Sequence, residues 1–212
     1  MIVGGADIAC YENIVAYLRD DDFFVFCDCG LKHMNSLKIK ADLVVGDFDS
    51  FKGERPDAET IVLPREKDDT DTVFAVKEAL KRGFEDFLLI GAVGARLDHT
   101  LGNVSILAML DSMGKKAMIA DDYSEMEVVS DRTVYIDDSY AYFSLLNVFG
   151  KAKGINISNA KYPLSNAEIT CDYQYGISNE VIQGKRAEVR IDDGRMLLVR
   201  IKKQAAGSVD KT

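Results

Sequence analysis

The chain has no tryptophan and only three prolines, four cysteines and two histidines among its 212 residues. Four cysteines in a chain of this length do not make a disulfide-rich scaffold, and no Cys-x-x-Cys pair is present. The spacing of Cys27, Cys29 and His33 matches a zinc site only weakly. We therefore expect buried structural thiols at these positions.

Long apolar runs are also absent. No stretch approaches the roughly 20 apolar residues that a membrane-spanning helix needs. The sequence opens with MIVGGA, without a basic region that leads into an apolar signal core. We therefore expect a cytoplasmic protein with no membrane partner.

Basic charge is scarce relative to acidic charge. The chain has 26 Lys and Arg against 35 Asp and Glu, a formal net charge of −9. Nucleic-acid backbones are bound mainly by clusters of Lys and Arg, so we expect no nucleic-acid partner. An acidic chain can still bind a nucleotide, because carboxylates hold phosphates through divalent cations.

Short apolar runs alternate with helical segments in residues 1–124, which predicts an α/β domain with a Rossmann-like, mostly parallel sheet. Apolar residues at helical spacing predict a helix over residues 71–82. A second helix, over residues 101–113, is apolar nearly all round and is expected to be buried. The candidate strands are residues 23–27, 43–45, 60–63, 86–92 and 117–120.

Residues 125–212 have a different sequence pattern, with short β-rich runs and no convincing helix between them. We expect a smaller all-β sandwich domain there. The turn Asp192-Asp193-Gly194 between the last two runs predicts a hairpin. The candidate strands are residues 126–129, 133–136, 141–148, 180–182, 187–191 and 196–201.

Two carboxylates, Asp47 and Asp49, follow a predicted strand in the string Val44-Val45-Gly46-Asp47-Phe48-Asp49-Ser50. In extended backbone, residues two apart point to the same side. Hard oxygen ligands at the carboxyl end of a parallel strand suit Mg²⁺. A polar loop with Asp and Ser capping explains this string, taken alone, equally well.

Three acids, Asp68, Asp69 and Asp71, stand where the first predicted helix begins, beside Lys67 and Thr70. A helix cap accounts for one of these residues. Clustered carboxylates are most easily tolerated when a cation or a basic side chain such as Lys67 neutralises them. The cluster therefore favours a second contribution to a cation or phosphate site.

A glycine-containing turn from Gly91 to Gly94 leads from a strand into the second predicted helix. Its amides and the helix N-terminus can cradle phosphates, and Arg96 can add a charge-assisted contact. Asp98 adds another acid at a strand's carboxyl end. His99 is either an acid–base group or a hydrogen-bonding structural residue.

Together the three strings indicate Mg²⁺-dependent phosphoryl or nucleotidyl chemistry at one edge of one sheet. The absence of GxxxxGK[ST] excludes a P-loop kinase, and no GxGxxG follows the first strand.

In this combination the sequence resembles the thiamine pyrophosphokinase family, over nearly the whole chain. The strings around Asp47 and Asp98 are the specific ones, and the C-terminal pieces are weaker. The matching pieces are Cys27-Asp28-Cys29-Gly30, Gly46 to Ser50, Lys67 to Asp71, Gly91 to His99 with Asn103, Tyr162-Pro163-Leu164 and Gly176 to Glu180.

The resemblance implies a homodimer that transfers a pyrophosphoryl group from ATP to the hydroxyl of thiamine in one step, with Mg²⁺, giving thiamine diphosphate and AMP. The first domain would bind ATP and Mg²⁺, and the second would carry Ser178 and Asn179 toward thiamine. Asp71 and Asp98 are the catalytic candidates, and the sequence does not choose between them as the base. The implied metal ligands are Asp47, Asp49, Asp71 and Asp98, and the implied ATP-binding residues are Asp28, Asp47, Asp49, Ser50, Lys67, Asp68, Thr70, Gly91, Gly94, Arg96 and His99.

The sequence departs from the family pattern in three places: Cys29 stands where glycine is common, and Ala92 and Ala95 stand in a turn that is often richer in glycine. Alanine resists a positive φ, so the phosphate turn can have a different shape here. Without tryptophan, an aromatic platform for thiamine would come from Tyr173 or Tyr175, which packing in a core or an interface explains equally well.

Two other functions stay open at this point. A Mg²⁺-dependent phosphatase would use Asp47 as its nucleophile, and a non-catalytic sensor of a nucleotide or vitamin would bind without turnover. The phosphatase leaves the other acids and the β-rich domain without a role.

Overall fold

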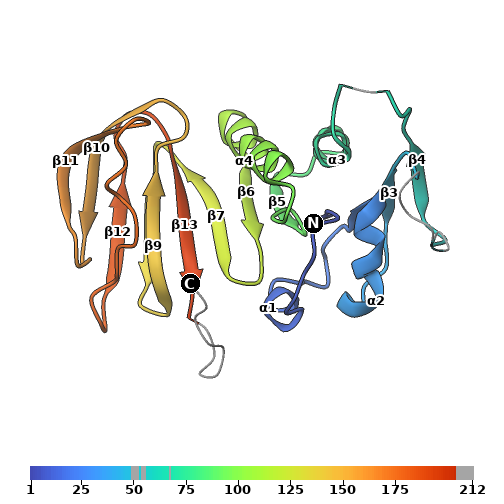
Figure 1. Ribbon diagram of the computed structural model, residues 1–212, viewed down its shortest axis with the longest axis horizontal. Coiled ribbons are helices and arrows are strands. Elements are labelled where there is room, and N and C mark those ends of the chain that lie inside the picture. Colours follow the sequence, from blue (N-terminus) through green and yellow to red (C-terminus); the bar gives the residue numbers. More distant parts are fainter. Residues whose placement is uncertain (49–52, 54–55, 67, 204–212) are drawn as a thin grey trace. The chain divides into compact units, whose positions relative to one another are not determined.

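The computed structural model of the chain describes residues 1–48, 53, 56–66 and 68–203. The chain divides into two compact units, Met1–Asp122 and Tyr123–Thr212. The first unit combines helices with a parallel sheet, and the second consists of antiparallel strands (Figure 1). The predicted fold class, an α/β domain followed by an all-β sandwich, is confirmed.

The sheet of the first unit has the strand order β4-β3-β2-β1-β5-β6, and every neighbouring pair is parallel. Strands that are buried on both faces have continuous apolar sequences, as β2 and β3 do. The central strand β1 has only two residues, and the sequence analysis did not predict it. The bounds are β1 (Ile2–Val3), β2 (Val25–Cys27), β3 (Leu43–Gly46), β4 (Glu59–Val62), β5 (Asp86–Ile90) and β6 (Lys116–Ala120).

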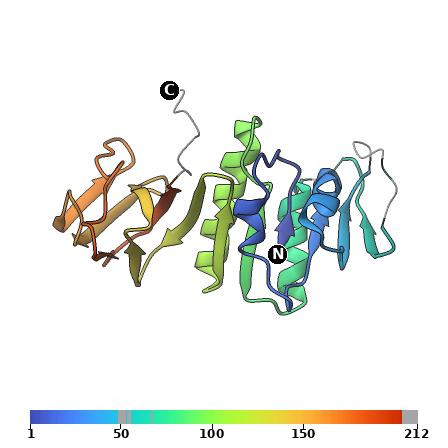
Figure 2. The ribbon, with the colours of Figure 1, turned by 90° about the horizontal axis from the view of Figure 1, so that it is seen from below.

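Helix α3 (Asp71–Lys81) confirms the first predicted helix. The Thr70 hydroxyl caps it by accepting a hydrogen bond from the Val73 N–H at 3.3 Å. α3 packs against β1, β2 and β3, while α4 (Leu97–Ser112) packs against β6 and α3. Figure 2 shows α4 running alongside the parallel strands. The shorter segments are α1 (Glu12–Val15), the 3-10 helix η1 (Asp28–His33) and α2 (Met34–Leu37).

The expectation that the second helix is buried was wrong for one of its faces. Val104, Leu107 and Leu110 of α4 are buried, but Leu97 and Leu101 are 65% and 58% exposed. An apolar sequence all round the helix does not by itself fix which face packs on the sheet. Apolar side chains therefore remain on the surface of this chain.

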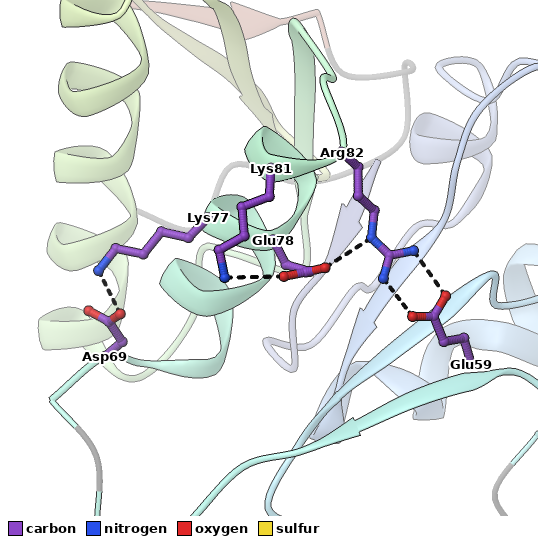
Figure 3. Close-up of polar contacts among 6 residues, drawn as sticks. All are labelled: Glu59, Asp69, Lys77, Glu78, Lys81 and Arg82. Carbon is purple, nitrogen blue, oxygen red and sulfur yellow. Dashed lines mark hydrogen bonds and ion pairs between the residues drawn. The ribbon is translucent and has the colours of Figure 1, made fainter.

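An ion-pair cluster links the end of α3 to β4. The guanidinium of Arg82 donates to both carboxylate oxygens of Glu59, at 2.9 and 2.6 Å, and to Glu78 at 3.1 Å (Figure 3). The bidentate geometry suits the planar guanidinium. This cluster fixes the C-terminal end of α3 beside the start of β4.

The strand order reverses direction at β1. β2, β3 and β4 follow one another on one side of β1, whereas β5 and β6 lie on its other side. Open α/β sheets bind ligands at such a switch point, outside the carboxyl ends of the strands. Here those ends lead into Gly4 after β1 and Gly91 after β5.

The second unit packs two antiparallel sheets around one apolar core. One has the order β7-β13-β9 and the other β11-β10-β12-β8. Phe143, Leu198, Ile136 and Ile155 belong to the core and come from both sheets. The bounds are β7 (Ser124–Val129), β8 (Thr133–Asp137), β9 (Tyr140–Leu146), β10 (Lys151–Ser158), β11 (Leu164–Thr170), β12 (Arg186–Arg190) and β13 (Met196–Lys202).

The hairpin predicted at residues 192–194 was wrong. β12 pairs with β10 and β8, whereas β13 pairs with β7 and β9, so the turn crosses between sheets. Its backbone pairs with the start of β10, because the Lys153 N–H donates to the Asp193 carbonyl at 2.9 Å. Gly194 has φ 87, so a tight turn is present, but the turn signal does not determine the strand's partner.

All four cysteines are free thiols. Cys27 is buried, and burial raises the pKa of its thiol to about 12. Cys29 is exposed, so the expectation of buried thiols is correct for Cys27 and wrong for Cys29. Among the described residues, no helix combines the length and apolar character needed to cross a membrane.

Candidate active site

A cavity of about 380 Å³ lies at the switch point of the parallel sheet. Its lining comes from the loop after β1, from η1, from the start of α3 and from the turn between β5 and α4. This volume is in the range of small-molecule sites, roughly 300–1,000 Å³. A second cavity of about 500 Å³ lies beside Met1, Phe23 and Asp86, where the strands begin. Because ligands bind at the carboxyl ends of parallel strands, we assign the site to the smaller cavity.

Glycines bring the loops after β1 and β5 into close contact. The Gly4 N–H donates to the Ile90 carbonyl at 2.8 Å, and the Ala6 N–H donates to the Gly91 carbonyl at 2.9 Å. Gly91 has φ 58, and a Cβ there would collide with the Gly4 carbonyl. Only glycine combines this backbone conformation with so close an approach. Glycine backbone at Gly5 and Gly91 therefore forms part of the cavity wall.

The turn between β5 and α4 is held by two polar side chains. The buried Asn103 amide donates to the Ala92 carbonyl at 2.7 Å, and the Gly94 N–H donates to the Thr100 hydroxyl at 3.2 Å. These bonds hold Gly91 and Gly94 in the cavity wall, and their predicted contact with ATP stays a prediction. The alanines at 92 and 95 line the same wall.

The acidic residues around the start of α3 have different roles. Asp69 forms an ion pair with Lys77 at 2.6 Å, also drawn in Figure 3, and Thr70 caps the helix. Asp68 is exposed and does not line the cavity. Asp71, in the first turn of α3, lines the cavity together with Thr70. One carboxylate of the string is thus directed to the site.

Arg96 and Asp98 form a bidentate ion pair at the start of α4. The Arg96 Nε donates to one carboxylate oxygen at 2.9 Å and Nη2 donates to the other at 2.6 Å. These hydrogen bonds hold the pKa of Asp98 far below its ordinary range. Arg96 and His99 line the cavity, whereas Asp98 is not among its lining residues.

Asp28 and Asp47 lie at the carboxyl ends of β2 and β3. Asp28 is buried, and a Cβ at Gly46 would come within 2.6 Å of the Asp28 Cβ, so the two strand ends pack closely. Asp47 is half-buried. Neither residue lines the cavity, although Cys27 and Cys29 on either side of Asp28 do.

The extended backbone predicted between Asp47 and Asp49 was wrong, because Phe48 has φ 58, in the left-handed region. A bulky residue with this φ is rare, and such backbones concentrate at functional sites. Asp49, Ser50 and Lys67, all predicted to bind ATP, lie outside the described residues.

The described residues do not assemble a complete metal site. Within residues 1–48, 53, 56–66 and 68–203, no group of three or more His, Cys, Asp or Glu side chains is placed to hold a metal ion. Both ring nitrogens of His33, the histidine of the weak zinc pattern, are engaged in hydrogen bonds rather than directed to a metal. They bond the Tyr11 hydroxyl at 2.7 Å and the Ala6 carbonyl at 2.9 Å.

The structure adds cavity residues that the sequence analysis did not select. Gly5 and Asp7 follow β1, and Lys32 lies on η1. The signal for the first two was the pair Gly4-Gly5 directly after the apolar Ile2-Val3. A two-residue run is too short to stand out as a strand without its neighbours in the sheet.

In the second unit, Ser178 and Asn179 have different environments. Ser178 is exposed, with φ 57, and its backbone N–H donates to the Ser144 hydroxyl at 3.0 Å. Asn179 is only 4% exposed, and its side chain bonds backbone groups of Tyr162. The Ser178 hydroxyl is therefore available to a ligand, and the Asn179 amide has a structural role.

Tyr173 and Tyr175 form a tilted ring pair with centroids 5.5 Å apart, and both are exposed. The Tyr175 hydroxyl donates to the Glu168 carbonyl at 2.6 Å, which fixes that ring over the end of β11. Because both rings are exposed, packing in a core does not explain this pair. A role at the surface remains for it.

Two family models match the chain. The model described as thiamin pyrophosphokinase, catalytic domain, matches residues 14–119, and the model described as thiamin pyrophosphokinase, vitamin B1 binding domain, matches residues 131–196. A curated relative, thiamine pyrophosphokinase of Bacillus subtilis (strain 168), is 26% identical over 207 residues, which cover 94% of this chain and 96% of the relative.

Solved structures show the same fold. A crystal structure of thiamin pyrophosphokinase from Geobacillus thermodenitrificans has a TM-score of 0.81 and 28% identity, covering 97% of each chain. The crystal structure of thiamine pyrophosphokinase from Bacillus subtilis has a TM-score of 0.85 and 24% identity, covering 96% of this chain and 98% of that one.

Proposed function

The chain belongs to the thiamin pyrophosphokinase family, and we propose that the cavity at the switch point is where it binds ATP. The protein transfers a pyrophosphoryl group from ATP to the hydroxyl of thiamine, giving thiamine diphosphate and AMP. The observation that carries this function is the pair of family matches, one within each compact unit and in the family's order. Neither a phosphatase nor a sensor has such support.

We assign the nucleotide to the first unit and thiamine to the second. The backbone amides around Gly91 and Gly94, with the N-terminus of α4, suit the phosphate chain, and Arg96 lines the same wall. In the second unit the exposed Ser178 hydroxyl is the ligand contact, and Asn179 holds the segment that carries it.

The reaction asks the protein mainly for positioning and charge stabilisation. The thiamine hydroxyl oxygen forms a bond to the β-phosphorus, and the bond from that phosphorus to the oxygen bridging to the α-phosphorus breaks. AMP leaves with the bridging oxygen. The hydroxyl proton passes to a carboxylate.

Of the two candidate bases, Asp71 is the better placed. It lines the cavity, whereas Asp98 is bound through both oxygens by Arg96 and has a strongly lowered pKa. A carboxylate already stabilised by a guanidinium is a weak proton acceptor. We therefore assign proton acceptance to Asp71 and the orientation of Arg96 to Asp98.

The carboxylates at this edge of the sheet are the type of ligand that Mg²⁺ binds. Carboxylates follow β2 and β3 and begin α3, and hard oxygen ligands at one sheet edge are what Mg²⁺ shares with phosphate. Asp47 would hold the ion with Asp49. Asp71, the assigned proton acceptor, would join them only after giving up that role, and Asp98 would join only by leaving Arg96. When bound, Mg²⁺ neutralises charge on the phosphates.

We also propose that the protein is a cytoplasmic homodimer. Leu97 and Leu101 are apolar, exposed and one turn apart on α4, which supports a protein partner for that face, because exposed apolar patches often mark interfaces.

The function is tested by incubating the purified protein with Mg·ATP, with and without thiamine. Thiamine-dependent AMP in equal amount to thiamine diphosphate is the expected result. ADP or inorganic phosphate would indicate an ordinary kinase or a phosphatase, and tight binding of both substrates without AMP would indicate a sensor.

A further inference from the structure

Lys32 is a cavity residue with no role in the fold's core. It stands on η1, at the carboxyl end of β2, and lines the cavity with Arg96. Its ammonium donates to the Asp7 carboxylate at 2.5 Å, and Asp7 belongs to the loop after β1. The Lys32 side chain is 41% exposed and that of Asp7 is 97% exposed.

The Asp7 to Lys32 pair contributes little to the fold. Exposed ion pairs are screened by water, and their ordering cost offsets most of their Coulomb energy. Its partners are already placed by other contacts, because Ala6 is held by the Gly91 carbonyl and by the buried ring of His33. Lys32 can therefore exchange its carboxylate for another anion at low cost.

The two cations of the cavity come from opposite sides of β1. Among the described residues, Lys32 and Arg96 are the lysine and arginine side chains in its lining, and they follow β2 and β5, which both pair with β1. The backbone of the loops after β1 and β5 lies between them. An extended polyanion seated on that backbone would meet positive charge from both sides.

We propose that Lys32 leaves Asp7 when ATP binds and donates to its phosphate oxygens, so that Asp7 competes with the triphosphate for the same ammonium. This rests on the proposed ATP site. It makes opposite predictions for the two partners, since loss of Lys32 weakens ATP binding and loss of the Asp7 charge strengthens it.

The test compares Lys32→Gln, Asp7→Asn and a matched control, Lys115→Gln. Lys115 forms an ion pair with Glu85 at 2.6 Å and is outside the lining of this cavity. Dissociation constants for ATP, ADP, AMP and adenosine would be measured by titration calorimetry at fixed Mg²⁺ and ionic strength, with thermal unfolding to verify folding.

Lys32→Gln is expected to weaken ATP binding roughly ten-fold, to weaken ADP binding less, and to leave adenosine binding unchanged. Asp7→Asn is expected to strengthen ATP binding about two- to five-fold. Lys115→Gln should match the wild type throughout.

Equal ATP affinity for Lys32→Gln and Lys115→Gln, or an equal loss for adenosine and ATP, would overturn the inference while leaving the proposed function intact. If Lys32→Gln fails to fold, Asp7→Asn decides, since unchanged or weaker ATP binding contradicts competition. A wild type that binds no ATP would overturn the proposed function and this inference together.

Discussion

The side-chain amide of Asn179 bonds both backbone polar groups of Tyr162: its Nδ2 donates to the Tyr162 carbonyl at 2.8 Å, and its Oδ1 accepts from the Tyr162 N–H at 3.0 Å. This relationship joins the Tyr162-Pro163-Leu164 string to the Gly176 to Glu180 string, which are separate in sequence. Asn179 thereby anchors the segment that carries Ser178, which is exposed and has φ 57.

Asn179→Ala is expected to lower the free energy of unfolding by about 1–2 kcal/mol, because it removes the buried amide and both of its part-buried hydrogen bonds to the Tyr162 backbone. Ser178→Ala removes an exposed hydroxyl and should change that free energy by less than about 0.5 kcal/mol. Ser178→Ala should instead raise KM for thiamine. Chemical denaturation and steady-state kinetics on both variants measure the contrast, and equal destabilisation by the two would contradict it.

Asp71→Asn is expected to reduce kcat by about 10²-fold or more while the fold persists, because an amide neither accepts the hydroxyl proton nor carries the carboxylate charge. The matched control is Asp69→Asn. Asp69 forms the exposed ion pair with Lys77 and should tolerate the change with little loss of rate. A near-normal rate for Asp71→Asn would remove it from the chemistry.

Asp98→Asn tests the other carboxylate. The change keeps the size of the side chain but loses the charge that orients Arg96 through two hydrogen bonds. Turnover should fall greatly with the thermal unfolding temperature nearly unchanged. Retention of the wild-type rate would show that Asp98 has no part in catalysis, even through Arg96.

Two glycines differ in what they tolerate. Gly91→Ala places a Cβ against the Gly4 carbonyl at φ 58 and should cost more than about 1–2 kcal/mol in unfolding free energy. Gly102 lies inside α4 with no heavy atom within 4 Å of an added Cβ, so Gly102→Ala should add about 0.5–1 kcal/mol. Denaturation of both variants measures the difference, and a stabilised Gly91→Ala would contradict the described turn.

The stability of the first unit should depend on pH through His33. Burial lowers the pKa of His33 from its ordinary value of 6.5. The neutral ring accepts from the Tyr11 hydroxyl and donates to the Ala6 carbonyl. The unfolded chain binds the proton more readily, so this contribution is intact above pH 6.5 and is lost as the pH falls from 6.5 through the lower folded pKa.

Wild type and His33→Gln would be compared by thermal unfolding between about pH 5 and pH 8. The variant should be less stable at neutral pH and show a flatter dependence below pH 6.5. Parallel curves for the two proteins would show that His33 is not the group responsible.

The sequence predicted the elements whose signals are local and long. The βα alternation and α3 have apolar periodicity and caps that a single segment reveals. β1 has no such local signal, because its two residues form a strand only by pairing with β2 and β5. The turn at Gly194 was recognised, but the choice between hairpin and crossover depends on β10, a distant segment.

For the site, residue types were easier to predict than geometry. Asp71, predicted at a helix start, and Arg96 and the glycines, predicted after a strand, line one cavity. The left-handed Phe48, the capture of Asp98 by Arg96 and the burial of Asn179 depend on neighbours in three dimensions. Lys32 was missed because an isolated lysine has no sequence pattern.

The proposed reaction moves the β- and γ-phosphoryl groups to thiamine together, and an isotope label in ATP distinguishes it from stepwise transfer. ATP carrying ¹⁸O in the bridge between the α- and β-phosphorus would be turned over with thiamine and Mg²⁺, and both products examined by mass spectrometry. Attack on the β-phosphorus predicts that all of the bridging label leaves in AMP and that no ADP accumulates. Bridging label in thiamine diphosphate, or ADP as the nucleotide product, would exclude attack on the β-phosphorus with AMP as the leaving group.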